Sequence, residues 1–219
     1  MESEFRPKLS ILQEPQRRLW SELSTVPRSF VLCGGTAVAL HLGHRQSVDF
    51  DFIASEGFDP DTLQFQTAFL QGSRTVQKSE NTLTCVVDRG GPVHVSFFGA
   101  PSIRLIEAPH IAPDNQLQIA SLLDLAGMKA AVVQKRAEAK DYFDLDAIIQ
   151  SEEVTLPAAL AAAKSIYGAN YNPELTLKSL CFFGDGTLPT LPREVRDRLA
   201  LAVKAVDLNH LPIISRSSP

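Results

Sequence analysis

The chain has 219 residues and a formal net charge of −4, and its 44% hydrophobic and 21% charged residues are the composition of an ordinary globular protein. This length can form one compact domain or two small ones with a sizeable core, and the net negative charge excludes a general attraction to nucleic acid, so RNA binding would have to rest on local basic patches. Three widely spaced cysteines argue against a disulfide framework. The sequence has no membrane-spanning apolar run and no apolar signal segment at the start, which argues against a membrane partner. Together these features predict a cytoplasmic location.

The first elements expected along the chain are a helix, a strand and a second helix. Residues 9–24 have the apolar spacing of an amphipathic helix, interrupted by Pro15. Residues 30–33 are a short apolar run that predicts a buried strand. Residues 36–42 predict about two turns of apolar helix that end at Gly43.

Gly34 and Gly35 lie at the start of this second helix, where backbone N–H groups and the helix dipole favour an anion. Glycine also lets a phosphate approach the backbone closely. The pair therefore indicates a phosphate cradle, although a Gly-Gly pair can also be no more than a tight turn between a strand and a helix.

The next segment, residues 48–52, alternates with a period of two. A strand with this pattern carries Asp49 and Asp51 on one face, about 7 Å apart, and Val48, Phe50 and Phe52 on the other. Two like charges this close repel each other unless a cation lies between them, and Mg²⁺ (or Mn²⁺) is the natural occupant because it takes oxygen ligands and bridges carboxylates to phosphates. The alternative is a solvated outer face.

The rest of the first half predicts a mixed sheet with helices against it. Residues 61–71 indicate a helix, and residues 81–88 and 92–98 indicate two strands separated by a hairpin turn at Arg89–Gly91. Residues 100–113 contain three prolines and mark a soft boundary. We therefore divide the chain into a core domain, residues 1–110, and a helical region, residues 111–219, that completes the site.

The second half is predicted to be helical. The sequence from Ser121 to Asp124 has the form of a capping box, and it opens a helix with Leu122, Leu125 and Ala126 as core positions. Further helices are expected at residues 139–150, 158–167, 173–182 and 192–208, and the second of the five helices is expected to bury Phe143, Leu145, Ile148 and Ile149. The expected fold class is α+β, with a small mixed sheet, flanking helices and a helical C-terminal region.

The glycine pair and the carboxylate pair together resemble the motif of a known protein family. The order Gly34-Gly35-Thr36 and then, about a dozen residues on, Arg45, Ser47, Asp49 and Asp51 resembles the minimal nucleotidyltransferase fold of the DNA polymerase β-like superfamily. More narrowly, it is similar to the AbiEii-type nucleotidyltransferase toxins of bacterial toxin–antitoxin systems. The resemblance covers residues 30 to about 150 and implies that Gly34, Gly35, Thr36, Arg45 and Ser47 bind the nucleotide.

A second group of residues belongs to the same resemblance and consists of Lys129, Arg136, Lys140, Asp141 and Asp144. The resemblance implies catalytic roles for Lys129 and Asp141 and nucleotide binding for Arg136. On one continuous helix Lys129 and Arg136 would share a face, because seven residues are close to two turns. Lys129 would then hold the β- and γ-phosphates, with Asp141 orienting one of the cations. Lys140 and Asp144 are also compatible with a plain i,i+4 ion pair that supports a helix.

The function implied is a Mg²⁺-dependent nucleotidyltransferase that transfers a nucleoside monophosphate from an NTP to an acceptor hydroxyl. By resemblance the acceptor is RNA (a transfer RNA end) or a protein side chain, and the enzyme is a toxin restrained by an antitoxin protein. The alternative is a nucleotide-binding module that is weak or inactive as a catalyst, because the strand at residues 92–98 offers Ser96 or His94 where many relatives have a third carboxylate. For His41 and His44 a structural role is favoured over zinc binding.

Overall fold

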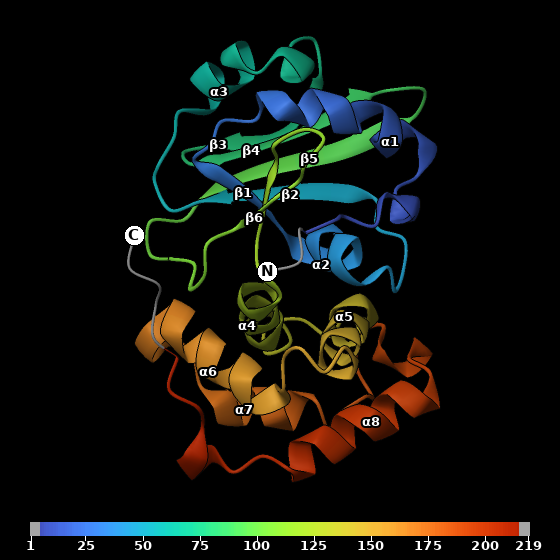
Figure 1. Ribbon diagram of the computed structural model, residues 1–219, viewed down its shortest axis with the longest axis vertical. Coiled ribbons are helices and arrows are strands. Elements are labelled where there is room, and N and C mark those ends of the chain that lie inside the picture. The colour runs from blue at the N-terminus through green and yellow to red at the C-terminus, as the bar shows by residue number, and fades with distance from the viewer. Residues whose placement is uncertain (1–4, 215–219) are drawn as a thin grey trace. The chain divides into compact units, whose positions relative to one another are not determined.

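The computed structural model describes residues 5–214, which form two compact units (Figure 1). The first unit comprises the chain up to Arg104 together with Pro109–Ala120, and the second comprises Leu105–Ala108 together with the chain from Ser121 onward. The chain therefore passes from one unit to the other at three places. The sequence placed the boundary between residues 110 and 111. The segment Pro109–Ala120 spans this boundary and lies entirely in the first unit.

The first unit is built on a mixed seven-stranded sheet with the order β3-β4-β5-β2-β1-β7-β6. Strand β2 is antiparallel to β1 and parallel to β5, and β7 is parallel to β1, so the predicted mixed sheet and α+β class are confirmed. The edge strands β3 and β6 and the short strand β7 were not predicted. The strands are β1 (Phe30–Cys33), β2 (Asp49–Ala54), β3 (Arg74–Ser79), β4 (Thr82–Asp88), β5 (Pro92–Gly99), β6 (His110–Ile111) and β7 (Gln118–Ile119).

Three α-helices accompany this sheet: α1 (Glu14–Trp20), α2 (Gly34–Leu42) and α3 (Pro60–Gln66). Pro15 lies in the first turn of α1, where its missing N–H costs nothing, so it begins this helix and does not interrupt a longer one. Helix α2 begins at Gly34, two residues earlier than predicted, and ends at Gly43, which has the left-handed conformation expected of a C-terminal glycine.

Aromatic side chains on one face of the sheet form the core of the first unit. Phe52 and Phe97 stack with ring centroids 5.0 Å apart, and Phe30 meets Phe97 edge to face at 5.1 Å. Phe50 and Phe52 are fully buried as predicted, but Val48 is 49% exposed because it precedes the strand. The alternation therefore leaves Asp49 and Asp51 on the opposite face. Figure 1 shows α1 and α2 on opposite sides of β1 and β2.

The second unit is helical, as predicted, and consists of α4 (Leu122–Val132), α5 (Ala139–Gln150), α6 (Leu156–Tyr167), α7 (Pro173–Ser179) and α8 (Arg193–Lys204). Ser121 caps α4 by accepting a hydrogen bond from the N–H of Asp124, as the capping pattern predicted. The carboxylate of Asp124 accepts hydrogen bonds from the N–H groups of Ile106 and Glu107 and so holds the segment Leu105–Ala108 in this unit. No helix in the described residues is long and apolar enough to cross a membrane.

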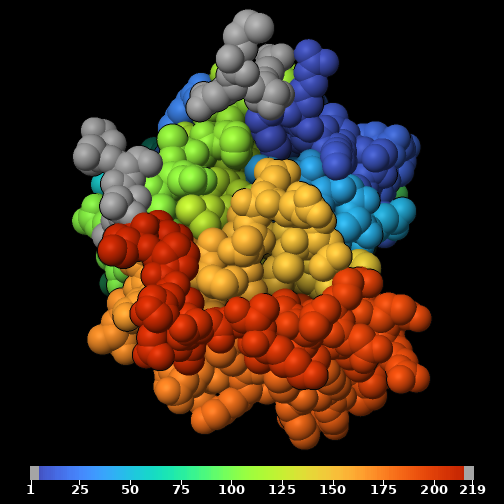
Figure 2. Space-filling model, turned by 60° about the horizontal axis from the view of Figure 1, so that its bottom comes forward, coloured from blue at the N-terminus to red at the C-terminus, as the bar shows by residue number. Residues whose placement is uncertain are grey.

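Helix α5 differs from its prediction in what it buries. Leu145 and Ile148 are buried as expected, but Phe143 and Ile149 are only half-buried. The other buried positions are polar and consist of Asp141, Tyr142, Asp144 and Asp146. Apolar spacing alone does not reveal this, because a carboxylate can be buried when cations pair with it. Asp146, for example, pairs with Arg198 of α8, which lies on the outside of the second unit (Figure 2).

Helices α4 and α6 pack closely because their facing residues are small. A Cβ atom added at Gly127 would lie 2.9 Å from the Cβ of Ala162 and 2.9 Å from the backbone nitrogen of Ala163. The alanine-rich sequence of α6 therefore serves this contact, which leaves no room for a larger side chain on α4.

Replacing Gly127 by valine is expected to lower the free energy of unfolding by about 1–3 kcal/mol, because the added methyl groups force the two helices apart. Denaturant unfolding followed by circular dichroism measures the change. Ala158→Val, at a half-buried position of α6, is the control for the helix propensity of valine. Equal losses in the two variants would show that the contact at Gly127 is not tight.

Candidate nucleotide site

The carboxylate pair of Asp49 and Asp51 lies on β2. The two adjacent strands determine which residues lie beside each carboxylate. Asp51 is paired in register with Cys33 of β1 on one side and with Ser96 of β5 on the other. Asp49 is paired with His94 of β5. Both aspartates are half-buried, Ser96 is buried and His94 is exposed. The face that carries the two carboxylates is therefore polar across β2 and β5.

Gly34 brings the first turn of α2 against Asp51. Its φ of +73° is in the left-handed region, and a Cβ atom there would lie 2.8 Å from Oδ2 of Asp51. A side chain at this position would therefore be strained by the backbone and would also meet the carboxylate. The N-terminal residue of the turn, Cys33, provides no side-chain hydrogen bond to α2. The N–H groups of this turn thus stand beside Asp51 at the end of the helix that favours anions.

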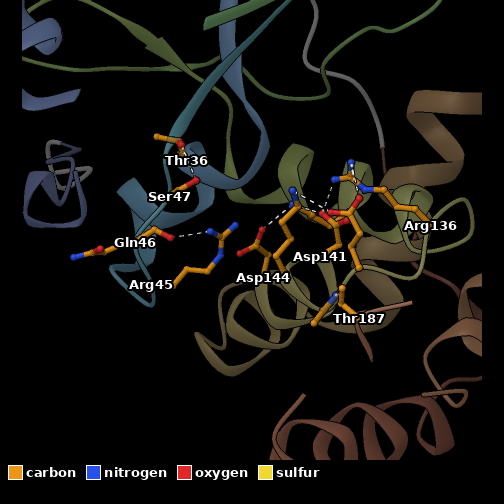
Figure 3. Close-up of polar contacts among 12 residues, drawn as sticks. Thr36, Arg45, Gln46, Ser47, Arg136, Asp141, Asp144 and Thr187 are labelled. Carbon is orange, nitrogen blue, oxygen red and sulfur yellow. Dashed lines mark hydrogen bonds and ion pairs between the residues drawn. The ribbon is translucent and has the colours of Figure 1, made fainter. Parts of the chain in front are cut away.

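Thr36 and Ser47 are buried and connect α2 to the start of β2. The hydroxyl of Thr36 donates a hydrogen bond to the backbone oxygen of Asp49, and its oxygen lies 2.8 Å from the hydroxyl oxygen of Ser47 (Figure 3). Arg45, in the loop before β2, donates from Nη1 to the backbone oxygen of Gln46 at 2.9 Å. Of the nucleotide-binding residues predicted in the first unit, Gly34 and Thr36 contact the carboxylate pair or its backbone, and Ser47 contacts Thr36.

The second unit contains a compact group of charges, which we call the Lys129 cluster and which consists of Lys129, Arg136, Asp141 and Asp144. Nζ of Lys129 lies 2.7 Å from Oδ1 of Asp141 and 2.7 Å from Oδ2 of Asp144. Arg136 binds Asp141 through two nitrogens, Nε at 2.7 Å and Nη2 at 3.1 Å (Figure 3). The side chains of the two aspartates are completely buried and that of Lys129 is 7% exposed, whereas that of Arg136 is 46% exposed.

The shared helix face that the sequence predicted for Lys129 and Arg136 is wrong. Helix α4 ends at Val132, so Arg136 lies beyond it and does not share a helix face with Lys129. The two cations are brought together by Asp141, which binds both, as one of the predicted roles of this residue required. Lys140 pairs with Glu138 at 3.0 Å, and Asp144 pairs with Lys129, so an i,i+4 pair between Lys140 and Asp144 does not explain the two residues.

The pKa of Asp141 reflects these contacts. Burial acts to raise it, but the hydrogen bond from Arg136, the charge of Lys129 and the hydrogen bond from Lys129 together outweigh burial and hold the pKa below its usual value. Asp141 is therefore a carboxylate anion at neutral pH, fixed by two cations.

Hydrogen bonds with Thr187, which the sequence did not suggest, hold the loop before α5. The hydroxyl of Thr187 accepts a hydrogen bond from the N–H of Ala139, the first residue of α5, at 2.8 Å, and the N–H of Thr187 donates to the oxygen of Ala137 at 3.0 Å. Gly186 has a φ of +52°, and a Cβ atom there would lie 2.2 Å from that oxygen. The only sequence signal is an Asp185-Gly186-Thr187 turn, which does not tell which helix it caps.

A divalent ion bound to the first unit would need further ligands from another molecule. Within residues 5–214 no group of three or more His, Cys, Asp or Glu side chains is arranged to hold a metal ion. Asp49 and Asp51 supply carboxylate oxygens, which Mg²⁺ prefers, but the remaining ligands would have to be water and phosphate oxygens. This donor set suits a metal that arrives with a nucleotide.

The comparisons with known proteins show the family of the chain. The sequence profile described as "Nucleotidyl transferase AbiEii toxin, Type IV TA system" matches residues 18–210. The chain belongs to the AbiEii family. An uncharacterized protein of Aquifex aeolicus (strain VF5) is 32% identical over 158 residues, which are 71% of this chain and 74% of that protein. The family predicted from the glycine and carboxylate motifs is thus confirmed, and this AbiEii protein is a nucleotidyltransferase of the toxin type.

Two solved structures show the same fold. MenT4, the nucleotidyltransferase toxin Rv2826c of Mycobacterium tuberculosis H37Rv, is 18% identical with a TM-score of 0.57, over 89% of this chain and 83% of that chain. A putative nucleotidyltransferase from H. pylori is 16% identical with a TM-score of 0.50, over 86% of this chain and 90% of that chain. The fold expected of a minimal nucleotidyltransferase is therefore present in this AbiEii protein.

The lowered pKa of Asp141 predicts a specific loss of stability in acid. A carboxylate whose pKa is lower in the folded than in the unfolded state stabilises the fold above the unfolded pKa of about 3.9, and this contribution disappears as the pH falls through the folded pKa. We expect the free energy of unfolding to decline below about pH 4, and Asp141→Asn to remove part of that decline while lowering stability at neutral pH by roughly 3–5 kcal/mol.

Urea unfolding at a series of pH values measures both effects. Asp197→Asn is the control, since Asp197 belongs to an exposed ion pair with Arg193 and should leave the acid decline unchanged. An Asp141→Asn variant with the wild-type pH profile would show that the cations do not lower the pKa of Asp141.

Proposed function

We propose that this AbiEii protein transfers a nucleoside monophosphate from an NTP to an acceptor hydroxyl with the help of Mg²⁺ or Mn²⁺. The observation that carries the proposal is the position of Gly34, whose backbone lies directly against the carboxylate of Asp51 at the start of α2. A phosphate held by the backbone of this turn is thereby a neighbour of the carboxylate pair. This is the arrangement that a metal-bound triphosphate needs.

Each residue of the first unit has a proposed part in holding the nucleotide. Asp49 and Asp51 bind the metal ion, and the backbone N–H groups of Gly34, Gly35 and Thr36 bind phosphate oxygens. Arg45 contributes positive charge from the loop before β2, and Ser47 acts through Thr36. The metal, when bound, neutralises charge on the phosphates and polarises the phosphorus that is attacked.

The reaction is an in-line displacement at the α-phosphorus. The acceptor oxygen forms the new P–O bond, the bond to the β-phosphate oxygen breaks, pyrophosphate leaves with that electron pair, and the acceptor proton passes to solvent or to a carboxylate. The backbone groups of α2 orient the triphosphate so that its leaving group points away from the acceptor. Little covalent chemistry falls to the protein, which is consistent with a site made of glycines, hydroxyls and carboxylates.

The residues of the Lys129 cluster also have proposed roles. The family resemblance assigns Lys129 to neutralising the charge that leaves with pyrophosphate, with Asp141 orienting it and Arg136 contacting the nucleotide. Two of the three N–H donors of Lys129 already bind carboxylates, while about half of the Arg136 side chain is exposed. Arg136 is therefore the member of the cluster that is better able to meet a further anion, and Lys129 acts mainly by fixing Asp141 and Asp144.

The acceptor and the partner are proposed from the family type. We propose RNA, such as a transfer RNA end, or a protein side chain as the acceptor, and a cognate antitoxin as the protein that restrains the activity. A rival proposal is a nucleotide-binding module with weak or no catalysis. It is favoured by one observation, which is that β5 places Ser96 and His94, and no carboxylate, beside Asp51 and Asp49.

Binding of an NTP with a divalent ion should require both carboxylates of β2. We expect the double variant Asp49→Asn with Asp51→Asn to lose metal-dependent NTP affinity by a factor of roughly 10 or more, since neutral amides are poor ligands for a hard cation. Calorimetric titration with and without Mg²⁺ measures the loss. Glu56→Gln, which removes an exposed carboxylate from the loop after β2, is the control. Unchanged binding by the double variant would refute the assignment of the metal site.

The number of bound metal ions separates the two proposals. With Ser96 and His94 in place of a carboxylate, a second ion would have to give up water without a charged protein ligand, and Mg²⁺ dehydrates reluctantly. We expect one ion with a non-hydrolysable NTP alone and a second only when the acceptor adds oxygens. Crystals soaked in Mn²⁺ and the analogue reveal the ions by anomalous scattering. Two fully occupied ions without acceptor would contradict this expectation, and no ion would favour the non-catalytic module.

A further inference from the structure

Thr36 has a hydroxyl that a phosphate cradle would normally use, yet this hydroxyl is buried and engaged elsewhere. The residue is 2% exposed, and its hydroxyl contacts the backbone oxygen of Asp49 and the hydroxyl of Ser47, which is 9% exposed. We infer that Thr36 and Ser47 are a positioning pair that fixes the Asp49 carboxylate for metal binding, and that the Thr36 hydroxyl is not a ligand of the phosphates. The inference rests on the proposed metal–nucleotide site.

The direction of the hydrogen bonds follows from counting protons. A hydroxyl has one proton, and a backbone oxygen can only accept, so Thr36 gives its proton to Asp49. Thr36 is the donor toward Ser47 as well, at 2.8 Å, so the two acceptors share this one proton. Phosphate oxygens also need a donor, so the Thr36 hydroxyl would have to release Asp49 before it could serve a phosphate.

The position of Asp49 explains why the strand needs this bond. The antiparallel pairing of β1 with β2 runs from Phe30 opposite Ala54 to Cys33 opposite Asp51, and then β1 ends. On the other side Asp49 is paired with His94 of β5. Asp49 is therefore the residue of β2 where the ladder with β1 has stopped, and the Thr36 hydroxyl takes over the hydrogen bond on that side.

Fixing the backbone here also fixes the carboxylate. The preceding residue, Val48, is 49% exposed and holds the strand end only weakly. Two carboxylates on one strand face repel each other, and without a pin the start of β2 would turn Asp49 away from Asp51 until a metal ion compensated the charge. The first turn of α2 thus positions both metal ligands. Gly34 leaves space for the carboxylate of Asp51, and the hydroxyl of Thr36 holds the backbone of Asp49.

Loss of the Thr36 hydroxyl should lower the metal affinity without lowering the affinity for phosphate. Thr36→Val keeps the shape but removes the hydroxyl, and we expect it to weaken Mn²⁺ binding in the presence of a non-hydrolysable NTP by roughly 10-fold, in the range found for groups that orient metal ligands. Thr36→Ser should restore the affinity to within about threefold, because it restores the donor. Binding of the analogue without a divalent ion should be the same in all three proteins.

Electron paramagnetic resonance of free Mn²⁺ measures the metal affinity, and calorimetry measures the metal-free binding of the analogue. Ser47→Ala is a second variant, expected to lower the Mn²⁺ affinity less than Thr36→Val because it leaves the bond to Asp49 in place. Thr25→Val is the matched control, since Thr25 makes the same kind of bond, to the backbone oxygen of Glu22, elsewhere in the first unit. Thermal unfolding by circular dichroism confirms that each variant is folded.

The outcomes separate this inference from the proposed function. If the wild-type protein binds no Mn²⁺ with the analogue, the metal site itself is refuted and the inference goes with it. If the wild type binds Mn²⁺ and Thr36→Val binds it equally well, only the positioning role is refuted. If Thr36→Val weakens metal-free binding of the analogue as much as it weakens Mn²⁺ binding, the hydroxyl is a phosphate ligand after all.

Discussion

The repulsion between Asp49 and Asp51 is the constraint around which the first unit is arranged. A strand that buries Phe50 and Phe52 must direct the intervening residues to the opposite face, so the two carboxylates cannot separate without unpacking the aromatic core. The positive end of α2 lies against the same face through Gly34, and a helix N-terminus moderates negative charge. The core therefore determines where the charges are, and α2 determines how they are tolerated.

The Lys129 cluster solves the same physical problem in a different way. Asp141 and Asp144 are fully buried, where uncompensated charge would be far more costly than on a half-buried strand face, and the chain supplies cations within hydrogen-bond distance. Asp49 and Asp51 keep part of their surface exposed, so a cation from solution has access to them. One carboxylate pair is thus built into the fold, whereas the other is suited to a ligand that comes and goes.

Sequence patterns predicted the elements whose cause is local, and they failed where the cause is a distant residue. The period-two run at β2, the Ser121 cap and α5, whose limits Ala139 and Gln150 were predicted correctly, depend on neighbours within a few residues. The burial of Asp146 on α5 and the cap that Thr187 provides for Ala139 depend on partners far along the chain. Spacing could name the members of the Lys129 cluster only through a resemblance, because Arg136 reaches Asp141 from beyond the end of α4.

The absence of a third carboxylate on β5 has a consequence for the protein without metal. Neighbouring strands lie about 4.8 Å apart, so an acid at the position of Ser96 would bring a third negative charge next to Asp51. Ser96 instead offers a neutral hydroxyl, 3.3 Å from that of Thr84 on β4. A face with two charges, pinned by Thr36 and moderated by α2, can stay folded before any metal binds, whereas three charges would depend on the ion for their stability. Under the proposed metal site, Ser96 at this position would therefore weaken the hold on a second ion and leave the sheet independent of the first.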